Sequence, residues 1–122
     1  MELAKRLVVA GINYIEAGSF VSPKWVPQMA STDQVFAELQ KYNFPETVTF
    51  AGLTPNMKGL EGAIASNVKE VAVFSAASEA FSMKNTNVTI AGSLDRQREV
   101  ATKALELGTI AFLALQCTIV LN

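Results

Sequence analysis

Residues Val68-Lys-Glu-Val-Ala-Val-Phe74 form a run that is nearly continuous in apolar residues around Glu70. Such a run is typical of a parallel strand that is buried on both faces, because a strand with one exposed face would alternate between apolar and polar residues. A helical pattern precedes it over residues 57–64, and another follows it over residues 90–107. The stretch therefore predicts a strand between two helices of a parallel α/β fold.

The same alternation continues on the N-terminal side of this run. Strand patterns occupy residues 12–16 and 47–53, and helical patterns occupy residues 2–10 and about 31–42. Helix and strand alternate with short turns between them. This order predicts strands that are parallel and adjacent in sequence order, with the helices on one outer side.

Residues with known capping preferences mark the helix boundaries. Ser31 and Gln34 have the spacing of a capping box, in which the two side chains bond each other's backbone amides. Asn56 and Thr89 are each suited to accept a hydrogen bond from the first turn of a helix. Gly108 stands where a glycine would end the last helix.

The expected architecture is a single partial (β/α) TIM barrel over residues 1–122, with three to four parallel strands and outer helices. Residues 109–122 form an atypical apolar tail that can add the fourth strand. A complete eight-stranded barrel needs about 250 residues. An open doubly wound sheet is the alternative, but no glycine-rich phosphate motif follows the first strand, which disfavours a dinucleotide-binding domain.

The composition excludes several classes of partner. The net charge is −1 and the basic residues are scattered, so we expect binding to neither nucleic acid nor an anionic membrane surface. No run reaches the length of about 20 apolar residues that spans a bilayer. The sequence holds no histidine and one cysteine, Cys117. A metal site formed by these residues alone would therefore depend on carboxylates, amides and one thiol.

Three segments follow the predicted strands, at residues 16–29, 54–56 and 75–87. In parallel α/β folds the ligand sites lie at the carboxyl ends of the strands, so these segments are the candidate site. Glu16 ends the first strand pattern, which predicts a carboxylate at the rim that contacts a ligand or forms a salt bridge with a neighbouring loop. The segment 75–87 is expected to be a polar loop before a helix, where an anionic or carbonyl group is favoured or the helix is simply capped.

The first of these segments has the most unusual composition. It contains two prolines and the only tryptophan, so it is expected to be rigid. Ser19 can hydrogen-bond a ligand or stabilise the turn, and Lys24 can reach a phosphate or remain a solvated surface group. Phe20 and Trp25 are expected to anchor the loop in the core.

Three motifs resemble segments of hydroxymethylglutaryl-CoA lyases, in the same order. They are Ile15-Glu-Ala-Gly-Ser-Phe-Val-Ser-Pro-Lys-Trp-Val-Pro-Gln-Met29, Leu53-Thr-Pro-Asn-Met-Lys-Gly-Leu-Glu61 and Lys69–Asn87. Related isopropylmalate and homocitrate synthases share the barrel, but the Ser-Pro-Lys-Trp-Val-Pro-Gln-Met loop favours the lyase. The resemblance covers residues 3 to about 108.

The resemblance implies a metal-dependent cleavage of 3-hydroxy-3-methylglutaryl-CoA to acetyl-CoA and acetoacetate. By position it implies catalytic roles for Glu16 and Ser19. It also implies a set of residues on the substrate and CoA side, namely Asn56, Ser75, Lys84 and Asn85. The cofactor implied is a divalent cation, usually Mg²⁺, whose ligands these residues do not include. The R-D-G-L-Q and H-x-H segments of the family are absent from the sequence, while Cys117 lies at a matching distance from Gly108.

From this inventory the 122 residues alone are expected to be inactive, with an acyl-CoA as the family's substrate. Two alternatives remain open. One is a non-catalytic interaction module whose free strand edges pair with a second copy or another protein, and the other is a fragment of a related acyl-CoA-dependent synthase. The expected location is the cytoplasm for a bacterial source and the mitochondrial matrix for a eukaryotic one.

Overall fold

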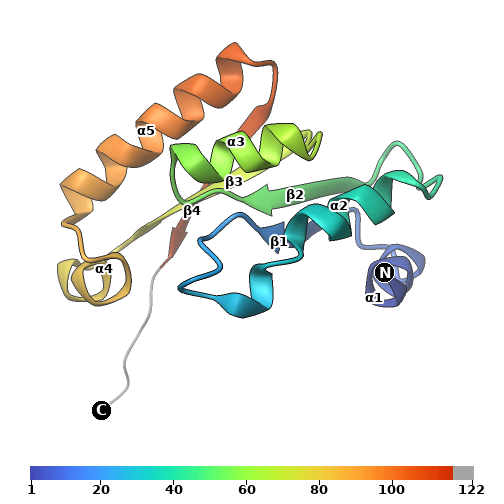
Figure 1. Cartoon of the computed structure of the whole chain (residues 1–122), viewed down its shortest axis with the longest axis horizontal. Helices are drawn as coiled ribbons and strands as arrows, with labels where there is room; N and C mark the ends of the chain where they lie inside the picture. The colour runs from blue at the N-terminus through green and yellow to red at the C-terminus, as the bar shows by residue number, and fades with distance from the viewer. Residues whose placement is uncertain (117–122) are drawn as a thin grey trace.

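The computed structural model describes residues 1–116, which contain a four-stranded, entirely parallel sheet in the order β1-β2-β3-β4 (Figure 1). The strands are β1 (Tyr14–Ser19), β2 (Thr49–Leu53), β3 (Glu70–Ala76) and β4 (Ile110–Gln116). The predicted parallel strands and their order are confirmed, and residues 110–116 supply the fourth strand. Cys117, with its suggested match to the family, lies outside the described residues.

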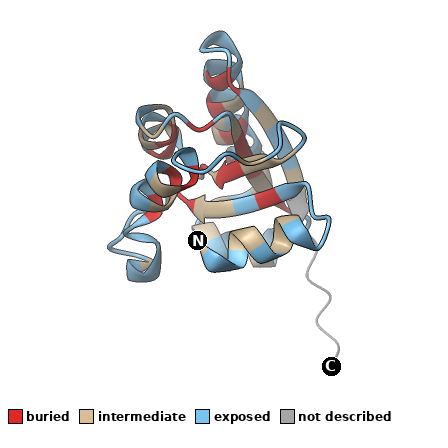
Figure 2. Cartoon of the chain, turned by 90° about the vertical axis from the view of Figure 1, so that its right-hand side faces the viewer, coloured by how far each residue is buried: buried red, intermediate tan, exposed pale blue. Residues whose placement is uncertain are grey.

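Three helices cover one face of this sheet, as predicted. The helices of the chain are α1 (Glu2–Val9), the 3₁₀ turn η1 (Pro27–Met29), α2 (Thr32–Gln40), α3 (Met57–Ala65), α4 (Glu79–Thr86) and α5 (Ile90–Glu106). The core lies between the sheet and α2, α3 and α5. It consists of Phe36, Leu39, Leu60, Ala63, Val68, Val71, Val73, Val100 and Ala104. Figure 2 shows these buried segments in red between the two layers.

The opposite face of the sheet is open and concave. The rings of Tyr14 on β1 and Phe112 on β4 have centroids 6.0 Å apart. In a flat sheet, three strand spacings of about 4.8 Å would hold side chains that stand perpendicular to it about 14 Å apart. The sheet therefore curves so that its first and fourth strands face each other. This is an arc of a (β/α) barrel, and the predicted fold class is confirmed.

The number of aligned residue pairs differs between neighbouring strands of this arc. Five residue pairs align between β1 and β2, with a bulge between Glu16 and Gly18. Only three align between β2 and β3, whereas seven align between β3 and β4. Because β3 continues four residues beyond Ala72, the partner of Leu53, its carboxyl end projects past that of β2.

Two predicted boundaries at the carboxyl edge are wrong. The first strand does not end at Glu16 but continues to Ser19, because the bulge admits an extra residue and pairing with β2 resumes. Residues 75–87 are not a loop, since they contain the end of β3 and the helix α4. The Ser78 hydroxyl accepts a hydrogen bond from the Phe81 amide at the start of α4, and Asn87 ends it in the left-handed conformation, with φ of 55°.

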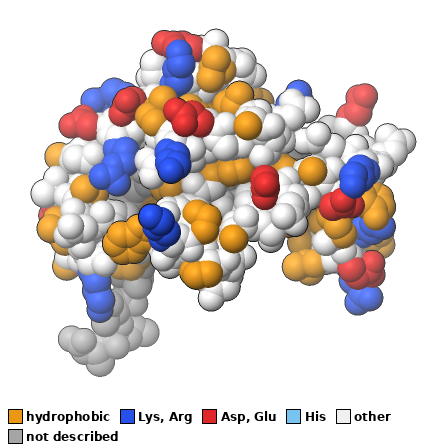
Figure 3. All heavy atoms as spheres, viewed as in Figure 1, with side chains coloured by type: hydrophobic (Ala, Val, Ile, Leu, Met, Phe, Trp, Pro, Cys, Tyr) orange, Lys and Arg blue, Asp and Glu red, His pale blue; other side chains and the backbone are white. Residues whose placement is uncertain are grey.

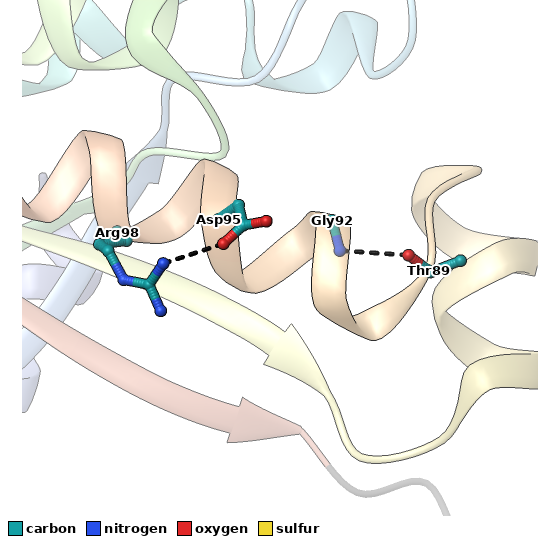
Figure 4. A network of polar contacts seen from close by, with 4 residues as sticks. All are labelled: Thr89, Gly92, Asp95 and Arg98. Carbon is teal, nitrogen blue, oxygen red and sulfur yellow. Dashed lines mark hydrogen bonds and ion pairs between the residues drawn. The ribbon is translucent and has the colours of Figure 1, made fainter.

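Of the other capping predictions, two are confirmed and one is wrong. Asn56 and Thr89 each accept a hydrogen bond from the third residue beyond, as expected of N-caps. Figure 4 shows the Thr89 cap together with the ion pair between Asp95 and Arg98 on the same helix. The capping box at Ser31 is wrong, because Ser31 precedes α2 without a side-chain hydrogen bond to it. The neighbouring hydroxyl of Thr32 instead bonds the backbone at the end of β1.

Candidate functional site

The parallel order of β1, β2 and β3 places three chain segments at one edge of the sheet. Residues 20–31 follow β1, residues 54–56 follow β2, and residue 77 begins the turn into α4. Blue and red side chains are interspersed on the face seen in Figure 3, so this face presents no extended basic patch. None of the described helices is both long and apolar enough to cross a membrane.

Glu16 lies on the open face, three residues before the end of β1. It is level with Ala51 on β2 and with Glu70 on β3. Its neighbour Ile15 is buried on the helix side, whereas Glu16 is exposed. The carboxylate is therefore inside the arc of the barrel and below its rim, not on the rim itself.

Tyr14 lies on the same face as Glu16, and its phenol is influenced by the Glu70 carboxylate. The pKa of the Tyr14 phenol is raised to about 12, first by burial, next by its hydrogen bond to the Glu70 carboxylate, and then by the negative charges of Glu70 and Glu16. A neutral phenol can donate to a carboxylate, so both causes that involve Glu70 act in the same direction. The open face thus combines one phenol with two carboxylates.

Ser19 ends β1 and is buried, with 8% of its surface exposed. Its backbone is hydrogen-bonded to the Thr32 side chain at the start of α2. Ser19 also lines a pocket of about 240 Å³ formed between the loop after β1 and the first turns of α2 and α3. Four of its lining residues have polar side chains and are exposed to solvent, namely Ser22, Asp33, Asn56 and Lys58.

The loop after β1 is anchored by one of the two aromatic residues expected to hold it. Phe20 stacks on Phe36, with ring centroids 5.7 Å apart, and it lies against the three glycines Gly52, Gly59 and Gly62. Trp25 is not an anchor, because 85% of its surface is exposed at the loop tip. The amides of Trp25 and Val26 both bond the Ser22 carbonyl, so the tip is a closed turn.

The remaining candidate site residues lie in different surroundings and do not face one common cavity. The Asn56 side-chain oxygen accepts from the Gly59 amide at 2.9 Å, so its acceptor is engaged in the helix cap. Ser75 is 1% exposed, and its hydroxyl contacts that of Ser93 at 3.4 Å in the layer between β3 and α5. Lys84 and Asn85 are exposed on α4. Ser75 is thus on the opposite side of the sheet from Glu16.

The described residues do not fit a complete divalent-cation site. They contain no group of three histidine, cysteine, aspartate or glutamate side chains placed to hold a metal ion. Glu16 and Glu70 are carboxylates on the open face, and both raise the pKa of the Tyr14 phenol beside them. Since Mg²⁺ requires near-octahedral oxygen coordination, this pair would leave most positions to other groups.

Sequence reasoning missed the contribution of Tyr14 and Glu70. The alternation of Tyr14 and Glu16 along one strand was a usable signal, because residues two apart lie on the same face. The register that brings Glu70 level with Glu16 has no local signature in the sequence. Lys58 and Thr32 were also missed, because each becomes part of the site only when two helices begin beside the same loop.

The described chain is therefore one side of a parallel (β/α)-barrel protein, with its candidate site on the concave face and at the carboxyl edge. The chain belongs to the HMGL-like family, whose sequence model matches residues 1–118.

The relatives and solved structures that it resembles carry lyase names. This chain is 56% identical over 96 residues to the 3-hydroxy-3-isohexenylglutaryl-CoA/hydroxy-methylglutaryl-CoA lyase of Pseudomonas aeruginosa. The aligned residues cover 79% of this chain and 31% of that protein. This chain is 48% identical over 106 residues to the mitochondrial hydroxymethylglutaryl-CoA lyase of Arabidopsis thaliana, covering 87% and 22%. The chain spans less than a third of the length of both relatives.

The structural likeness is equally extensive. The crystal structure of hydroxymethylglutaryl-CoA lyase from Pseudomonas aeruginosa has a TM-score of 0.83 and 49% identity, covering 93% of this chain and 37% of that one. An HMG-CoA lyase from Acinetobacter baumannii, solved in complex with coenzyme A and 3-methylmalate, has a TM-score of 0.79 and 29% identity, covering 93% and 36%.

Proposed function

We propose that the chain carries one side of the acyl-CoA site of a carbon–carbon lyase. The reaction is the cleavage of 3-hydroxy-3-methylglutaryl-CoA to acetyl-CoA and acetoacetate. The observation that carries the proposal is that the segments resembling the lyases lie together in the fold and within the part of the chain that the family model matches. The three motif segments lie on consecutive strands of one arc, and the family model covers them all. The lyase names of the relatives and the coenzyme A bound in a structural neighbour support the substrate class.

On this proposal Glu16 and Ser19 act on the substrate from inside the arc. The Glu16 carboxylate is exposed on the concave face, where it can accept a hydrogen bond or a proton from a substrate hydroxyl. The Ser19 hydroxyl lies further toward the rim on the same strand. Its backbone is fixed by Thr32, so its position is set before a substrate binds.

Lys84 and Asn85 are proposed to contact the CoA portion. Both are exposed on α4, which follows the projecting carboxyl end of β3. A lysine ammonium attracts the phosphates of CoA and an asparagine amide can hydrogen-bond its carbonyl groups. Asn56 remains a proposed substrate-side residue whose amide nitrogen is the group left to donate. Ser75 would require a rearrangement to reach a ligand, since its hydroxyl contacts α5.

Metal chemistry belongs to the proposed whole enzyme and not to the described residues. A divalent cation in such a reaction polarises substrate oxygens. The described chain does not supply a complete set of ligands for it. We therefore propose that the 122 residues by themselves bind CoA without turning the substrate over. The proposed location is the cytoplasm for a bacterial source and the mitochondrial matrix for a eukaryotic one.

The test is a titration of the purified chain with CoA, followed by the fluorescence of its only tryptophan. Saturable binding is expected, and Lys84→Ala should weaken it roughly two- to fivefold, the range of an exposed ion pair worth up to about 1 kcal/mol. Lys41→Ala is the matched control, because Lys41 is exposed at the end of α2 and pairs with Glu38. No binding, or equal weakening by both substitutions, would contradict the CoA assignment.

Turnover is tested separately with 3-hydroxy-3-methylglutaryl-CoA and Mg²⁺, by following acetoacetate over time. We expect none from the chain by itself. Magnesium-dependent acetoacetate that disappears in Glu16→Ala would show that the residues form a complete active centre. The alternative of a non-catalytic interaction module is supported by one observation, the exposed apolar strand β4, and it would be favoured by the absence of CoA binding.

A further inference from the structure

Helix α4 is held in place by polar contacts more than by apolar packing. Of its eight residues, all of which the structure describes, only Ser82 is buried, with 0% of its surface exposed. Phe81 is partly buried, and Met83 is 46% exposed. A helix that buries so little apolar surface gains little from packing, so its hydrogen bonds to neighbouring segments decide where its side chains lie.

The first turn of α4 is bonded to the first residue of α5. The Oε2 atom of Glu79 accepts a hydrogen bond from the Ile90 amide at 3.1 Å, although the two residues are eleven positions apart in sequence. Ile90 begins α5, where backbone amides have no acceptor within the helix. The Thr89 hydroxyl accepts from the Gly92 amide, also at 3.1 Å. Each contact satisfies one of these amides, and the Glu79 contact also joins the two helices.

The middle of α4 is bonded to the turn that leads into α5. The Ser82 hydroxyl donates to the Val88 carbonyl at 2.8 Å, and the Thr86 hydroxyl donates to the Ser82 carbonyl at 3.0 Å. Asn87 lies between them in the left-handed conformation, which turns the chain back toward the helix. Glu79, Ser82 and Thr86 are three and four residues apart, so they occupy one side of α4.

Lys84 lies on the opposite side of α4 from these three residues. It is two residues beyond Ser82, which corresponds to a rotation of about 200° around the helix axis. Lys84 is exposed there, while α4 as a whole lies beside the start of α5 (Figure 1). The direction of the Lys84 side chain therefore depends on how the bonded side of α4 is held.

We propose that Glu79 is a positioning residue for the CoA portion of the substrate, and that it acts through Lys84. By accepting the hydrogen bond of Ile90, the Glu79 side chain fixes α4 on the start of α5 and so sets the place of the Lys84 ammonium, which attracts phosphate groups. The inference rests on the proposed function, in which Lys84 contacts CoA. All the contacts that carry it lie between residues 79 and 92.

The charge of Glu79 has to be separated from its hydrogen bond, because a carboxylate near Lys84 repels phosphate groups while the hydrogen bond keeps the lysine in place. Glu79→Gln removes the charge and keeps a side-chain oxygen that can accept from the Ile90 amide. Glu79→Ala removes both. Alanine is the strongest helix former, so a loss of binding in Glu79→Ala is not caused by a lower helix propensity. The difference between the two variants therefore measures the effect of the hydrogen bond.

The test is a titration of the purified variants with CoA, followed by tryptophan fluorescence. Glu79→Ala should bind CoA more weakly than Glu79→Gln, by a factor no larger than the roughly two- to fivefold loss expected for Lys84→Ala. In a Lys84→Ala background the two variants should bind CoA equally, because no ammonium is left to be positioned. Glu99→Ala is the control for the loss of a charge, since Glu99 is exposed on α5 about two and a half turns from Ile90, and it should not weaken binding.

Exchange of the Ile90 amide proton with deuterium tests the contact itself, and it should be faster in Glu79→Ala than in Glu79→Gln. Equal CoA dissociation constants for these two variants, with Lys84→Ala still weakening the binding, overturn the positioning role and leave the proposed function intact. A difference that persists in the Lys84→Ala background also overturns it, because Glu79 would then act through another group. An unsubstituted chain that does not bind CoA overturns the proposed function and this inference together.

Discussion

The side-chain oxygen of Thr32 lies 3.2 Å from the backbone nitrogen of Ser19 and 2.9 Å from its carbonyl oxygen. The same oxygen is 2.9 Å from the carbonyl of Met29, so one hydroxyl connects the end of β1, the turn after the loop and the start of α2. Its single hydrogen is donated to one of the two carbonyls at a time. This group replaces the capping box expected at Ser31, and it fixes the candidate residue Ser19.

Thr32→Val should therefore destabilise the fold. The substitution keeps the shape but leaves the Ser19 amide without its acceptor, at a cost of about 1–3 kcal/mol for a buried unsatisfied group. Thr32→Ser keeps the hydroxyl and should cost less. Urea unfolding of the three proteins measures the difference. Equal losses for Val and Ser would show that the methyl group, and not the hydroxyl, matters.

Gly52→Ala should displace Phe20. A Cβ at Gly52 would lie 2.8 Å from Cε2 of the Phe20 ring, which is already stacked on Phe36. Overpacking of this kind costs about 1–3 kcal/mol. The loss should shrink in a Phe20→Leu background, where the clashing ring atoms are gone. Gly92→Ala is the control, because Gly92 is exposed on α5 and its Cβ would meet only the Thr89 hydroxyl within 3.4 Å.

Gln97→Met should stabilise the chain. Gln97 is 6% exposed on α5, and its side-chain oxygen is buried without a hydrogen-bond partner among the described residues. Removal of an unsatisfied buried acceptor recovers about 1–3 kcal/mol, and methionine retains the length of the side chain. A rise in melting temperature is expected. Gln28→Met, at an exposed position, should leave it unchanged, and a fall for Gln97→Met would mean that the oxygen is bonded in solution.

The folded state should lose stability in alkali through Tyr14. Its pKa is raised to about 12 from an ordinary 10.0, so the unfolded chain releases this proton first as pH rises. The unfolded state then binds fewer protons, and the stabilisation present below pH 10 is lost between about pH 10 and 12. Absorbance at 295 nm follows the phenol, and Tyr14→Phe should remove this part of the pH dependence. A Tyr14 phenol that ionises near pH 10 in the folded chain would contradict the contact with Glu70.

The strands and their order could be predicted from the sequence because both depend on local pattern. The nearly continuous apolar run around Val71 is typical of a strand that is buried on both faces, and the alternation of helices and strands predicted parallel pairing. The end of β1 could not be predicted, since the bulge between Glu16 and Gly18 arises from pairing with β2. The helix α4 was missed because polar residues and serine resemble a loop, although Ser78 and Asn87 are recognisable caps.

For the candidate site residues, the position along the chain could be predicted better than the direction in which each side chain points. Ser75 was placed correctly near the end of β3, but the parity of the strand turns its hydroxyl toward Ser93. Successive side chains of a strand point to opposite faces of the sheet. An error of one residue in the expected alternation therefore places a side chain on the wrong face. Trp25 was expected in the core on the basis of size. In the structure Phe20 packs against three glycines, whereas Trp25 is exposed at the tip of the loop.

The three-residue alignment between β2 and β3 divides the sheet into two ribbons, one with five aligned pairs and one with seven. The residues at this seam between β2 and β3 are nevertheless almost fully buried, with Ala51 and Val71 at 0% and Ala72 at 1% exposed, so the amide protons of the seam are expected to exchange with deuterium slowly despite the short alignment. Glu16 and Ser19 belong to one ribbon, and the helix carrying Lys84 follows the other. The buried seam therefore holds the two parts of the proposed substrate site at a fixed separation.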